Sequence, residues 1–379
     1  MDSRRIKLLS IAFSRLKYIS YLLRRGKFKM ARNYLWVSIF TRDAGIALFD
    51  PIYRIWPSLA PYPEAIEIEV TTRCHLRCII CEQAYWHEKP REMSFEEFKK
   101  IVDQFPRLKW IGMTGIGSSF LNKDYLKMLK YLKSRSIFIE FYDSFDLISE
   151  DISKQLIEIG VDKIWLSCDA STKETYEKIR IGTKWEKVMK NVRDFVRIKR
   201  EKCTPIPEFW FHYVVTSLNI NEMTDFLDLV YSLVGKDTNY AILITFSAVL
   251  RFPQVRHLWV DIPRFLMRDV EKKARELGLF VNWNQNITPT QQMRRCTKWT
   301  EPFILATGHV QPCCIINEAN TREHQKKYSF GNVFTESFAA IWKGKYRECV
   351  RRIHRGEMPE ICRYCRAFRL PEQTELNKK

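Results

Sequence analysis

The sequence of 379 residues lacks a long apolar run and lacks a recognisable secretion signal. A membrane-spanning helix needs roughly 18 consecutive apolar residues, whereas the run from Leu8 to Phe13 is soon interrupted by Arg15 and Lys17. No small-residue cleavage site follows that run, so it does not resemble a signal peptide. Without such a signal, the eleven cysteines are expected to stay reduced rather than to form a disulfide framework. The sequence therefore predicts a cytoplasmic protein whose thiols are available to metal.

Acidic residues are scarce near the N-terminal end. Residues 1–60 contain twelve Lys and Arg against three Asp, and they carry nearly half of the formal charge of +19. Apolar residues recur at helical spacing from Ile6 to Leu23, and after Gly26 a second basic and aromatic segment runs from Lys27 to Phe40. A basic amphipathic helix could lie at a membrane surface. The alternative is a helical extension packed on the rest of the chain, and prolines between residues 51 and 63 indicate a boundary near residue 60.

Beyond that boundary, strand-like and helix-like segments alternate. Residues Ala65 to Val70 have the period of two that is typical of a strand, with isoleucine and valine on one face and glutamate on the other. Alternation of strands with helices indicates a parallel sheet, in which ligands sit at the carboxyl ends of the strands. Five further strands are expected at Trp110 to Met113, Ile137 to Tyr142, Lys163 to Ser167, Phe209 to Val215 and Ile242 to Phe246.

Three cysteines with the spacing Cys-x3-Cys-x2-Cys directly follow the first of these strands. They are Cys74, Cys78 and Cys81. Three thiolates on one short loop favour a single soft metal centre, and an iron–sulfur cluster held by three rather than four thiolates keeps one iron open to another ligand. The alternatives for the isolated spacing are a zinc loop or buried free cysteines, although zinc prefers a complete tetrahedral set.

This loop resembles the signature of the radical S-adenosylmethionine (SAM) superfamily, which follows the first strand of a partial (β/α)6 barrel. The resemblance implies that Cys74, Cys78 and Cys81 hold a [4Fe–4S] cluster whose open iron binds SAM. Reductive cleavage of SAM would then give a 5′-deoxyadenosyl radical that removes a hydrogen atom from a substrate. Ile80, which precedes the last cysteine, would cover the adenine of SAM.

Two further motifs match the family in part. Thr114 to Leu121 contains Gly115, Gly117 and Ser118 where the family binds the methionine end of SAM, but serines replace the usual Glu-Pro. The run from Ser167 to Arg180 resembles Ser-x-Asp-Gly-x-Thr followed by Tyr-x-x-x-Arg, which makes Ser167 a SAM contact and Arg180 a clamp for the SAM carboxylate. The alternative for Arg180 is a surface charge on a helix.

Other candidate residues carry less information. Cys168 and Cys203 are interpreted as packing thiols. His212, in the fifth expected strand, either faces the substrate or is structural. Tyr142 to Ser144 stands where Thr-Asn-Gly often follows the third strand of the family. No catalytic side chain is assigned.

A second group of cysteines lies near the C-terminal end. Its spacing, with Gly308 between the first two cysteines, resembles the SPASM and twitch domains, in which a hairpin brings distant cysteines together. The resemblance implies one auxiliary [4Fe–4S] cluster with four thiolate ligands, and Pro371 stands where a full SPASM domain would have a further cysteine. Cys314 is interpreted as a buried neighbour of these ligands, with a substitute ligand or a hydrogen-atom donor as the alternatives. For the whole group, a structural zinc site is the alternative. The four expected ligands are Cys296, Cys313, Cys362 and Cys365.

These observations predict an α/β enzyme with a helical extension at residues 1–60, a radical SAM partial barrel at 61–285 and a SPASM/twitch-like domain at 286–379. The expected activity is an oxidoreductase- or transferase-type modification of a small sugar-, cyclitol- or lipid-like substrate. The alternatives are a peptide- or protein-modifying maturase, an RNA-modifying iron–sulfur enzyme and a zinc-binding scaffold without catalysis. Expected partners are a flavodoxin or ferredoxin as electron donor and, through residues 1–40, a membrane surface. The helical and apolar character of that segment argues against nucleic acid.

Overall fold

The computed structural model describes residues 15–40, 52, 55–235, 242–250, 252–284, 296, 298–318, 321–363 and 365. The chain forms two compact units, each assembled from separate stretches of sequence. The first unit consists of Met1–Arg32, His75–Ala84 and Leu132–Ile287, and the second of Asn33–Cys74, Tyr85–Tyr131 and Thr288–Lys379. The three predicted domains are not tested by this division and remain a prediction.

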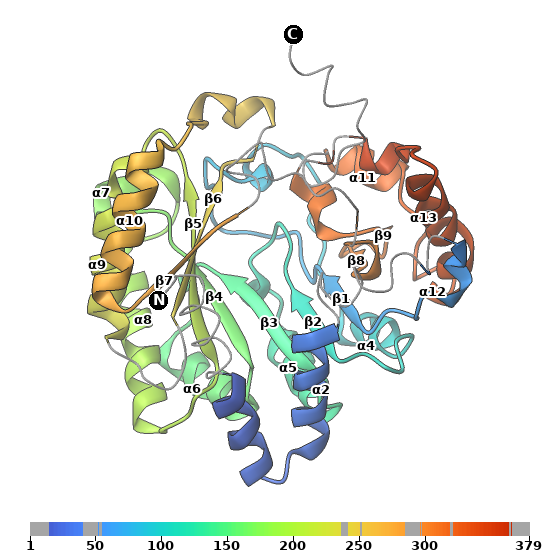
Figure 1. The fold of residues 1–379 in the computed structure, drawn as a ribbon, viewed down its shortest axis with the longest axis horizontal. Coiled ribbons are helices and arrows are strands. Elements are labelled where there is room, and N and C mark those ends of the chain that lie inside the picture. Colours follow the sequence, from blue (N-terminus) through green and yellow to red (C-terminus); the bar gives the residue numbers. More distant parts are fainter. Residues whose placement is uncertain are drawn as a thin grey trace. The chain divides into compact units, whose positions relative to one another are not determined.

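The first unit is built on five parallel strands in the order β3, β4, β5, β6, β7. Their bounds are β3 Phe138–Asp143, β4 Lys163–Ser167, β5 Glu208–Val215, β6 Leu243–Ala248 and β7 Phe280–Trp283. Helices α6 Glu150–Ile159, α7 Lys173–Ile179, α8 Trp185–Glu201, α9 Met223–Val234 and α10 Arg264–Leu277 connect the strands. Figure 1 shows these helices along one side of the strands. The predicted strands in this unit are confirmed to within two residues at each end, whereas β7 was not predicted.

Alternation along the strands explains which face the helices cover. Residues such as Phe141, Leu166 and Phe211 are fully or almost fully buried, because successive side chains in a strand point to opposite faces and these meet the helices. The opposite face carries polar and aromatic residues, among them Tyr142 and His212. Packing of one face against the helices therefore forms the core, and the opposite face carries the polar and aromatic side chains.

The second unit contains four neighbouring strands in the order β2, β1, β8, β9. The first three strands, β1 Ala65–Ile68, β2 Trp110–Met113 and β8 Phe303–Ile304, are parallel, and β9 Val310–Gln311 returns antiparallel to β8. The β8–β9 hairpin turns at Gly308, which has φ +82°, as the resemblance implied. Strand β1 ends at Ile68, two residues earlier than predicted.

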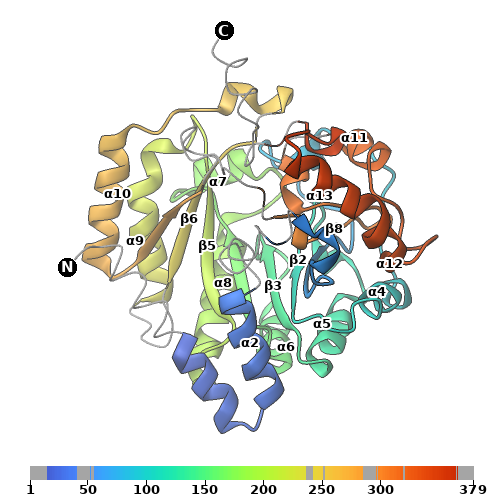
Figure 2. The same ribbon diagram turned by 45° about the vertical axis from the view of Figure 1, so that its right-hand side comes forward.

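The helices of the second unit are shown from another direction in Figure 2. They include α4 Phe95–Val102, α5 Tyr125–Ser134, whose last turn crosses into the first unit, α11 Arg322–Lys327, α12 Phe338–Ile341 and α13 Arg347–His354. Helix α4 begins with a capping box formed by Ser94 and Glu97. Phe105, Phe338 and Tyr346 are completely buried and form part of an aromatic core.

The described residues before the first strand include helices at residues 15–24 and at α2 Phe28–Phe40. They confirm the two predicted helical segments for the residues described, while residues 6–14 of that prediction lie outside them. Tyr18 and Leu22 are buried, and the hydroxyl of Tyr18 donates a hydrogen bond to Asp162. In the described part of the chain, no helix has the length and apolar character needed to cross a bilayer.

Candidate active site

The cysteine loop leaves the carboxyl end of β1, as predicted. Cys74, Cys78 and Cys81 are each partly exposed, and the amide of Cys81 donates to the carbonyl of Cys78 over 3.1 Å. The division between the two units runs between Cys74 and His75. The structure therefore describes Cys78 and Cys81 with the first unit and Cys74 with the second, and their shared coordination of one cluster remains a prediction.

Within the first unit, the cysteine loop is hydrogen-bonded to the residues that follow α7. The amide of Arg77 donates to the carbonyl of Ile181 over 2.8 Å, and the amide of Ile79 donates to that of Ile179 over 2.9 Å. Gly182 has φ +99°, and a Cβ atom there would lie 3.3 Å from the carbonyl oxygen of His75. Glycine is thus required for this close approach.

His75, next to the first cysteine, anchors the same loop through its side chain. Its Nε2 lies 2.6 Å from Oδ2 of Asp146, whose other oxygen accepts a hydrogen bond of 2.9 Å from the hydroxyl of Thr183. The amide group of Asn191 donates to the backbone carbonyl of Phe145 over 2.8 Å. A buried carboxylate therefore connects the cysteine loop to the start of α8. Asp146 was not predicted from the sequence because no local pattern marks it.

Two candidate SAM contacts, Gly115 and Gly117, pack against the second unit's own chain. A Cβ atom at Gly115 would lie 2.5 Å from Cγ of Glu69, and one at Gly117 would collide with the carbonyl oxygen of Thr71. The amide of Ser118 donates to the carbonyl of Arg73 over 2.8 Å. These contacts alone require both glycines, and the role of Gly115, Gly117 and Ser118 toward SAM remains a prediction.

Glu69 is the centre of a buried ion-pair network in the second unit. Only 1% of Glu69 is exposed, and Oε2 lies 2.6 Å from a guanidinium nitrogen of Arg322 on α11. Its two oxygens also accept the amides of Ile116 over 3.1 Å and Ala306 over 3.2 Å. Arg322 in turn lies 3.1 Å from Glu88. The network fixes the end of β1, the glycine loop and the β8–β9 hairpin to one another.

The alternation of residues in the first strand placed Glu69 on a polar face, and this prediction was incomplete. Glu69 follows the last residue of β1, where its carboxylate is buried by Arg322, which lies 253 positions later in the chain. A buried carboxylate is retained when a cation and hydrogen-bond donors surround it. The only hint in the sequence is its place at the carboxyl end of a strand, directly before the cysteine loop.

Arg180, predicted to clamp the SAM carboxylate, is buried and already has a protein partner. Its guanidinium lies 2.6 Å from Oδ2 of Asp169. The other carboxylate oxygen of Asp169, Oδ1, accepts a hydrogen bond of 2.8 Å from the amide of Val214. Burial favours the neutral guanidine, but Asp169 and then the Cys78 thiolate raise the pKa of Arg180 above its ordinary value. A surface location, the alternative considered for Arg180, is excluded because the residue is only 8% exposed.

Some hydrogen-bonding capacity remains beside Cys78. Among the residues described, the buried Nε of Arg180 and the buried hydroxyl of Tyr176 have no hydrogen-bond partner. Burial raises the pKa of Tyr176, and the electrostatic influence of Cys78 on it indicates that the two side chains are close. Two unpartnered donors beside Cys78, a predicted cluster ligand, fit the carboxylate of a bound amino-acid group. Ser167, at the end of β4, and the buried Ile80 remain predicted contacts.

The four C-terminal cysteines all belong to the second unit. Cys313, Cys362 and Cys365 are buried, and the amide of Cys365 donates to the carbonyl of Cys362 over 2.9 Å. Burial, with smaller contributions from Cys362 and Cys365, raises the pKa of Cys296 to about 12. The pKa of Cys313 is raised by burial and by the other three thiols. Four thiols that influence one another electrostatically fit the donor set of an iron–sulfur cluster.

A fifth thiol also lies in this group. Cys349 on α13 is buried, and its hydrogen bond with Cys362 is the largest cause of the raised pKa of Cys362. Cys314, which was expected to be a buried neighbour of the four ligands, is instead partly exposed. Over the described residues, no three His, Cys, Asp or Glu side chains converge tightly enough to hold a single metal ion. The assignment of the four ligands remains a prediction.

Comparison with protein families supports the sequence motifs. The radical SAM superfamily matches residues 68–230, and the iron–sulfur cluster-binding domain known as SPASM matches residues 296–366. The two matches contain the two predicted cysteine groups. The SPASM match also includes the β8–β9 hairpin.

Two relatives match over most of the chain. A tungsten-containing aldehyde ferredoxin oxidoreductase cofactor-modifying protein of Pyrococcus furiosus is 27% identical over 79% of this chain and 86% of its own. An AdoMet-dependent heme synthase of Oleidesulfovibrio alaskensis is 24% identical over 83% of this chain and 79% of its own. Both similarities extend well beyond the radical SAM match.

Solved structures show the same fold. SuiB of Streptococcus suis, bound to S-adenosylmethionine, superposes with a TM-score of 0.62 at 12% identity and covers 95% of this chain and 85% of its own. The enzyme anSMEcpe with bound AdoMet superposes with a TM-score of 0.56 at 16% identity and covers 83% of this chain and 95% of its own. The predicted α/β fold with a parallel sheet and a C-terminal SPASM domain is thereby confirmed.

The two domains imply a SAM-binding [4Fe–4S] cluster, auxiliary iron–sulfur clusters and SAM itself as cofactors, as predicted. The sequence motifs, the fold and the relatives agree on one assignment. The chain is a radical SAM enzyme with a C-terminal SPASM domain.

Proposed function

We propose that this enzyme removes a hydrogen atom from a small sugar-, cyclitol- or lipid-like substrate and that a second cluster assists the oxidation or modification. When bound, SAM and its cluster supply the 5′-deoxyadenosyl radical that takes the hydrogen atom. An external flavodoxin or ferredoxin delivers the electron. The proposed ligands are Cys74, Cys78 and Cys81 for the SAM cluster and Cys296, Cys313, Cys362 and Cys365 for the auxiliary cluster.

The residues around Cys78 are suited to orient SAM. The unpartnered Nε of Arg180 and hydroxyl of Tyr176 can donate to its carboxylate. Asp169 keeps Arg180 charged, because its carboxylate raises the pKa of the guanidinium. The link between His75 and Asp146 holds the cysteine loop against the start of α8. These residues position the cofactor and leave the substrate to other parts of the sheet.

The observation that carries the substrate class is the order of side chains on the face of the first unit's sheet opposite its helices. Near the amino ends of the strands, Lys163 lies 3.8 Å from Glu208. In the next row, the rings of Tyr142 and Trp165 stack with their centroids 5.3 Å apart, and Trp210 lies edge-on to Trp165 at 4.9 Å. This face of the sheet is therefore charged near the amino ends of the strands and aromatic in the next row of side chains.

Uncharged polar groups follow toward the carboxyl ends. Nε2 of His212 lies 2.9 Å from the hydroxyl of Ser247, which accepts a hydrogen bond of 3.1 Å from the side-chain amide of Asn284. Burial lowers the pKa of His212 to about 4, so the ring is neutral at physiological pH. This row can exchange hydrogen bonds with hydroxyl groups without imposing a charge.

An aromatic surface beside neutral hydrogen-bonding groups suits a hydroxylated ring. The C–H face of such a ring can lie on Tyr142, which is 41% exposed, while its hydroxyls meet the polar row. A peptide-modifying role is the second candidate. It rests on the fold shared with SuiB, which was solved with its precursor peptide SuiA, and at 13% identity that likeness concerns the fold alone.

Cleavage of SAM provides the test. The anaerobically reconstituted and reduced enzyme should release 5′-deoxyadenosine from SAM, whereas Cys78→Ala should release none because the open cluster loses a ligand. Tyr142→Ala should still cleave SAM but should lose coupled modification of its substrate. Release of 5′-deoxyadenosine by the Cys78 variant at the wild-type rate would contradict the assignment of the first cluster.

A further inference from the structure

Exposed apolar side chains are concentrated at one end of the sequence. Of the twelve large apolar residues that are exposed in the described part of the chain, nine lie between residues 16 and 59. Isolated exposed apolar residues need no explanation, but a local concentration marks an interaction surface. The catalytic proposal uses none of these nine residues.

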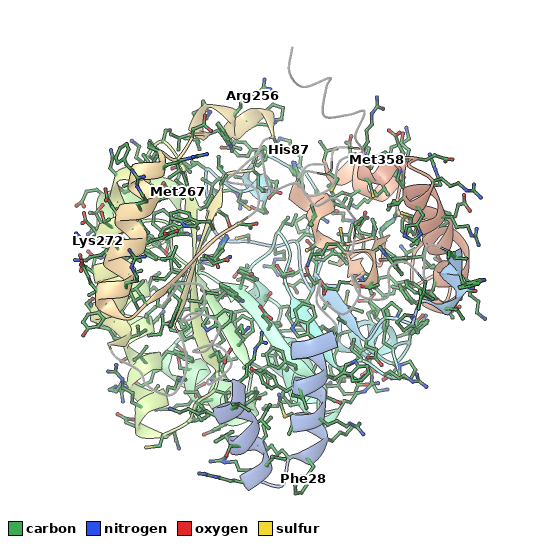
Figure 3. All side chains as sticks on the ribbon, in the orientation of Figure 1. Phe28, His87, Arg256, Met267, Lys272 and Met358 are labelled. Carbon is green, nitrogen blue, oxygen red and sulfur yellow. The ribbon has the colours of Figure 1, made fainter. Side chains whose placement is uncertain are left out.

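The turn between the two N-terminal helices combines this apolar exposure with positive charge. We call residues 23–29, whose sequence is Leu-Arg-Arg-Gly-Lys-Phe-Lys, the basic tip. All seven residues are exposed, with Leu23 at 44% and Phe28 at 66%. Four of them are Lys or Arg, and the sequence contains no Asp or Glu between Asp2 and Asp43. Figure 3 shows Phe28 at the outer end of the helical hairpin.

The basic tip is attached to the first unit by the other side of its helix. Tyr18 and Leu22 are buried, Tyr18 donates to Asp162, and the hydroxyl of Thr204 lies 3.4 Å from that of Tyr21. The guanidinium of Arg25 lies 4.6 Å from the centre of the Tyr21 ring. Packing of the helix is thus satisfied without Leu23 and Phe28, whose exposure calls for a different explanation.

From this geometry we propose that the basic tip docks the enzyme on an anionic membrane surface. Arg24, Arg25, Lys27 and Lys29 are placed to neutralise lipid phosphates, while Leu23 and Phe28 enter the boundary between headgroups and acyl chains. Nucleic acid would pair the charges with stacking rings, yet the tip offers a single ring and an aliphatic leucine. An acidic protein partner would need no apolar insertion.

Co-sedimentation of the full-length enzyme with lipid vesicles tests the proposal. We expect binding to vesicles of equal parts phosphatidylcholine and phosphatidylglycerol, weak or no binding to pure phosphatidylcholine, and a loss of most binding when salt rises from about 0.05 M to about 0.5 M, because salt screens the charges. Leu23→Ser with Phe28→Ser should weaken binding about tenfold or more, since two apolar side chains no longer insert.

Matched controls use exposed residues elsewhere. Phe265→Ser changes a phenylalanine on α10 that is 60% exposed, and Lys343→Gln with Lys345→Gln removes two exposed charges from the second unit. These variants should bind like the wild type, whereas Lys27→Gln with Lys29→Gln should bind several-fold more weakly. Circular dichroism confirms that every variant is folded, and all of them should still cleave SAM.

Three outcomes would overturn the proposal. One is failure of the wild-type protein to sediment with phosphatidylglycerol vesicles. Another is unchanged vesicle binding by the Leu23 and Phe28 double variant. The third is tighter binding to a structured RNA than to vesicles with no loss in that double variant. None of these results depends on the substrate, so they are distinguishable from a failure of the catalytic proposal.

Discussion

At the scale of single residues, Asp146 explains how the loop of the first cluster keeps its position. Its carboxylate meets His75 at 2.6 Å and the hydroxyl of Thr183 at 2.9 Å, and it is almost completely buried. Cluster ligands depend on outer residues that fix their orientation, and the loss of such a residue commonly weakens metal binding. Asp146 is therefore a positioning residue rather than a ligand.

We expect Asp146→Ala to lower the iron content of the reconstituted protein toward half, because the auxiliary cluster is unaffected. The reduced variant should also lose the change in its electron paramagnetic resonance spectrum that SAM causes in the wild type. Asp194→Asn, which removes an exposed pairing with Lys190 in the same unit, is the control. Full iron content with a normal response to SAM in the Asp146 variant would rule out this role.

His212 allows a prediction about pH. Burial lowers its pKa from 6.5 to about 4, so the folded state disfavours protonation. Its contribution to stability is complete above the unfolded pKa and is lost as the pH falls from 6.5 toward 4. Between about pH 7.5 and pH 5.5 this loss amounts to about 1 kcal/mol.

Replacement by Gln, which cannot be protonated, should remove that part of the pH dependence. Urea unfolding at both pH values measures it, and the exposed His257→Gln is the control. An identical pH dependence in the His212→Gln variant and the wild type would show that His212 titrates normally.

At the scale of elements, the link between α7 and α8 depends on a glycine. Gly182 has φ +99° and faces the backbone of His75 and Leu76. Gly278, at the end of α10, also has a positive φ, but a Cβ atom there would meet nothing within 4 Å. Substitution of each glycine in turn therefore separates the free-energy cost of a positive φ from the cost of a close approach to the cysteine loop.

Gly182→Ala should destabilise the protein by about 1–3 kcal/mol through backbone strain and should also reduce cluster incorporation, because the cysteine loop is displaced. Gly278→Ala should share the loss of stability without the loss of iron. Thermal unfolding and iron analysis of the two variants measure these effects. Normal iron content in the Gly182 variant would argue against the proposed contact with the loop.

The elements that could be predicted are those with a local signal. Strand β2 has the bounds expected from the sequence, and Gly308 lies at the hairpin turn. Strand β7 escaped prediction because its residues Phe280–Trp283 are only half-buried and lack a clear alternation. An alternating hydrophobic pattern indicates that one face of a strand is buried. A short strand at the edge of a sheet buries few side chains, so its sequence shows little of this pattern.

The candidate site divides in the same way. The two cysteine groups could be found because ligand spacing is a property of short segments, and the matched families contain both. Asp146 and Glu69 could not, because the role of each depends on a partner distant in sequence. The partner of Glu69 lies 253 residues away.

At the scale of the whole molecule, two separate clusters predict how much iron the loss of one cysteine should remove. Cys362→Ala should remove about half of the iron, since the proposed auxiliary cluster would lose a buried ligand, while SAM cleavage without substrate continues. Cys203→Ala, an exposed cysteine outside both groups, should keep the full iron content. Iron and sulfide analysis with a 5′-deoxyadenosine assay gives the answer, and a complete loss of both clusters in the Cys362 variant would contradict their independence.

The pairing of β1 with β8 and of Glu69 with Arg322 has a consequence for truncation. A chain shortened before residue 296 would lose the strand beside β1 and the only guanidinium that the described residues place on Glu69. It would be left with an unpaired strand edge and a buried anion without a counterion. Residues 1–295 should therefore aggregate when produced alone. The SPASM domain should be required for a stable fold, so it should not be separable from the rest of the chain.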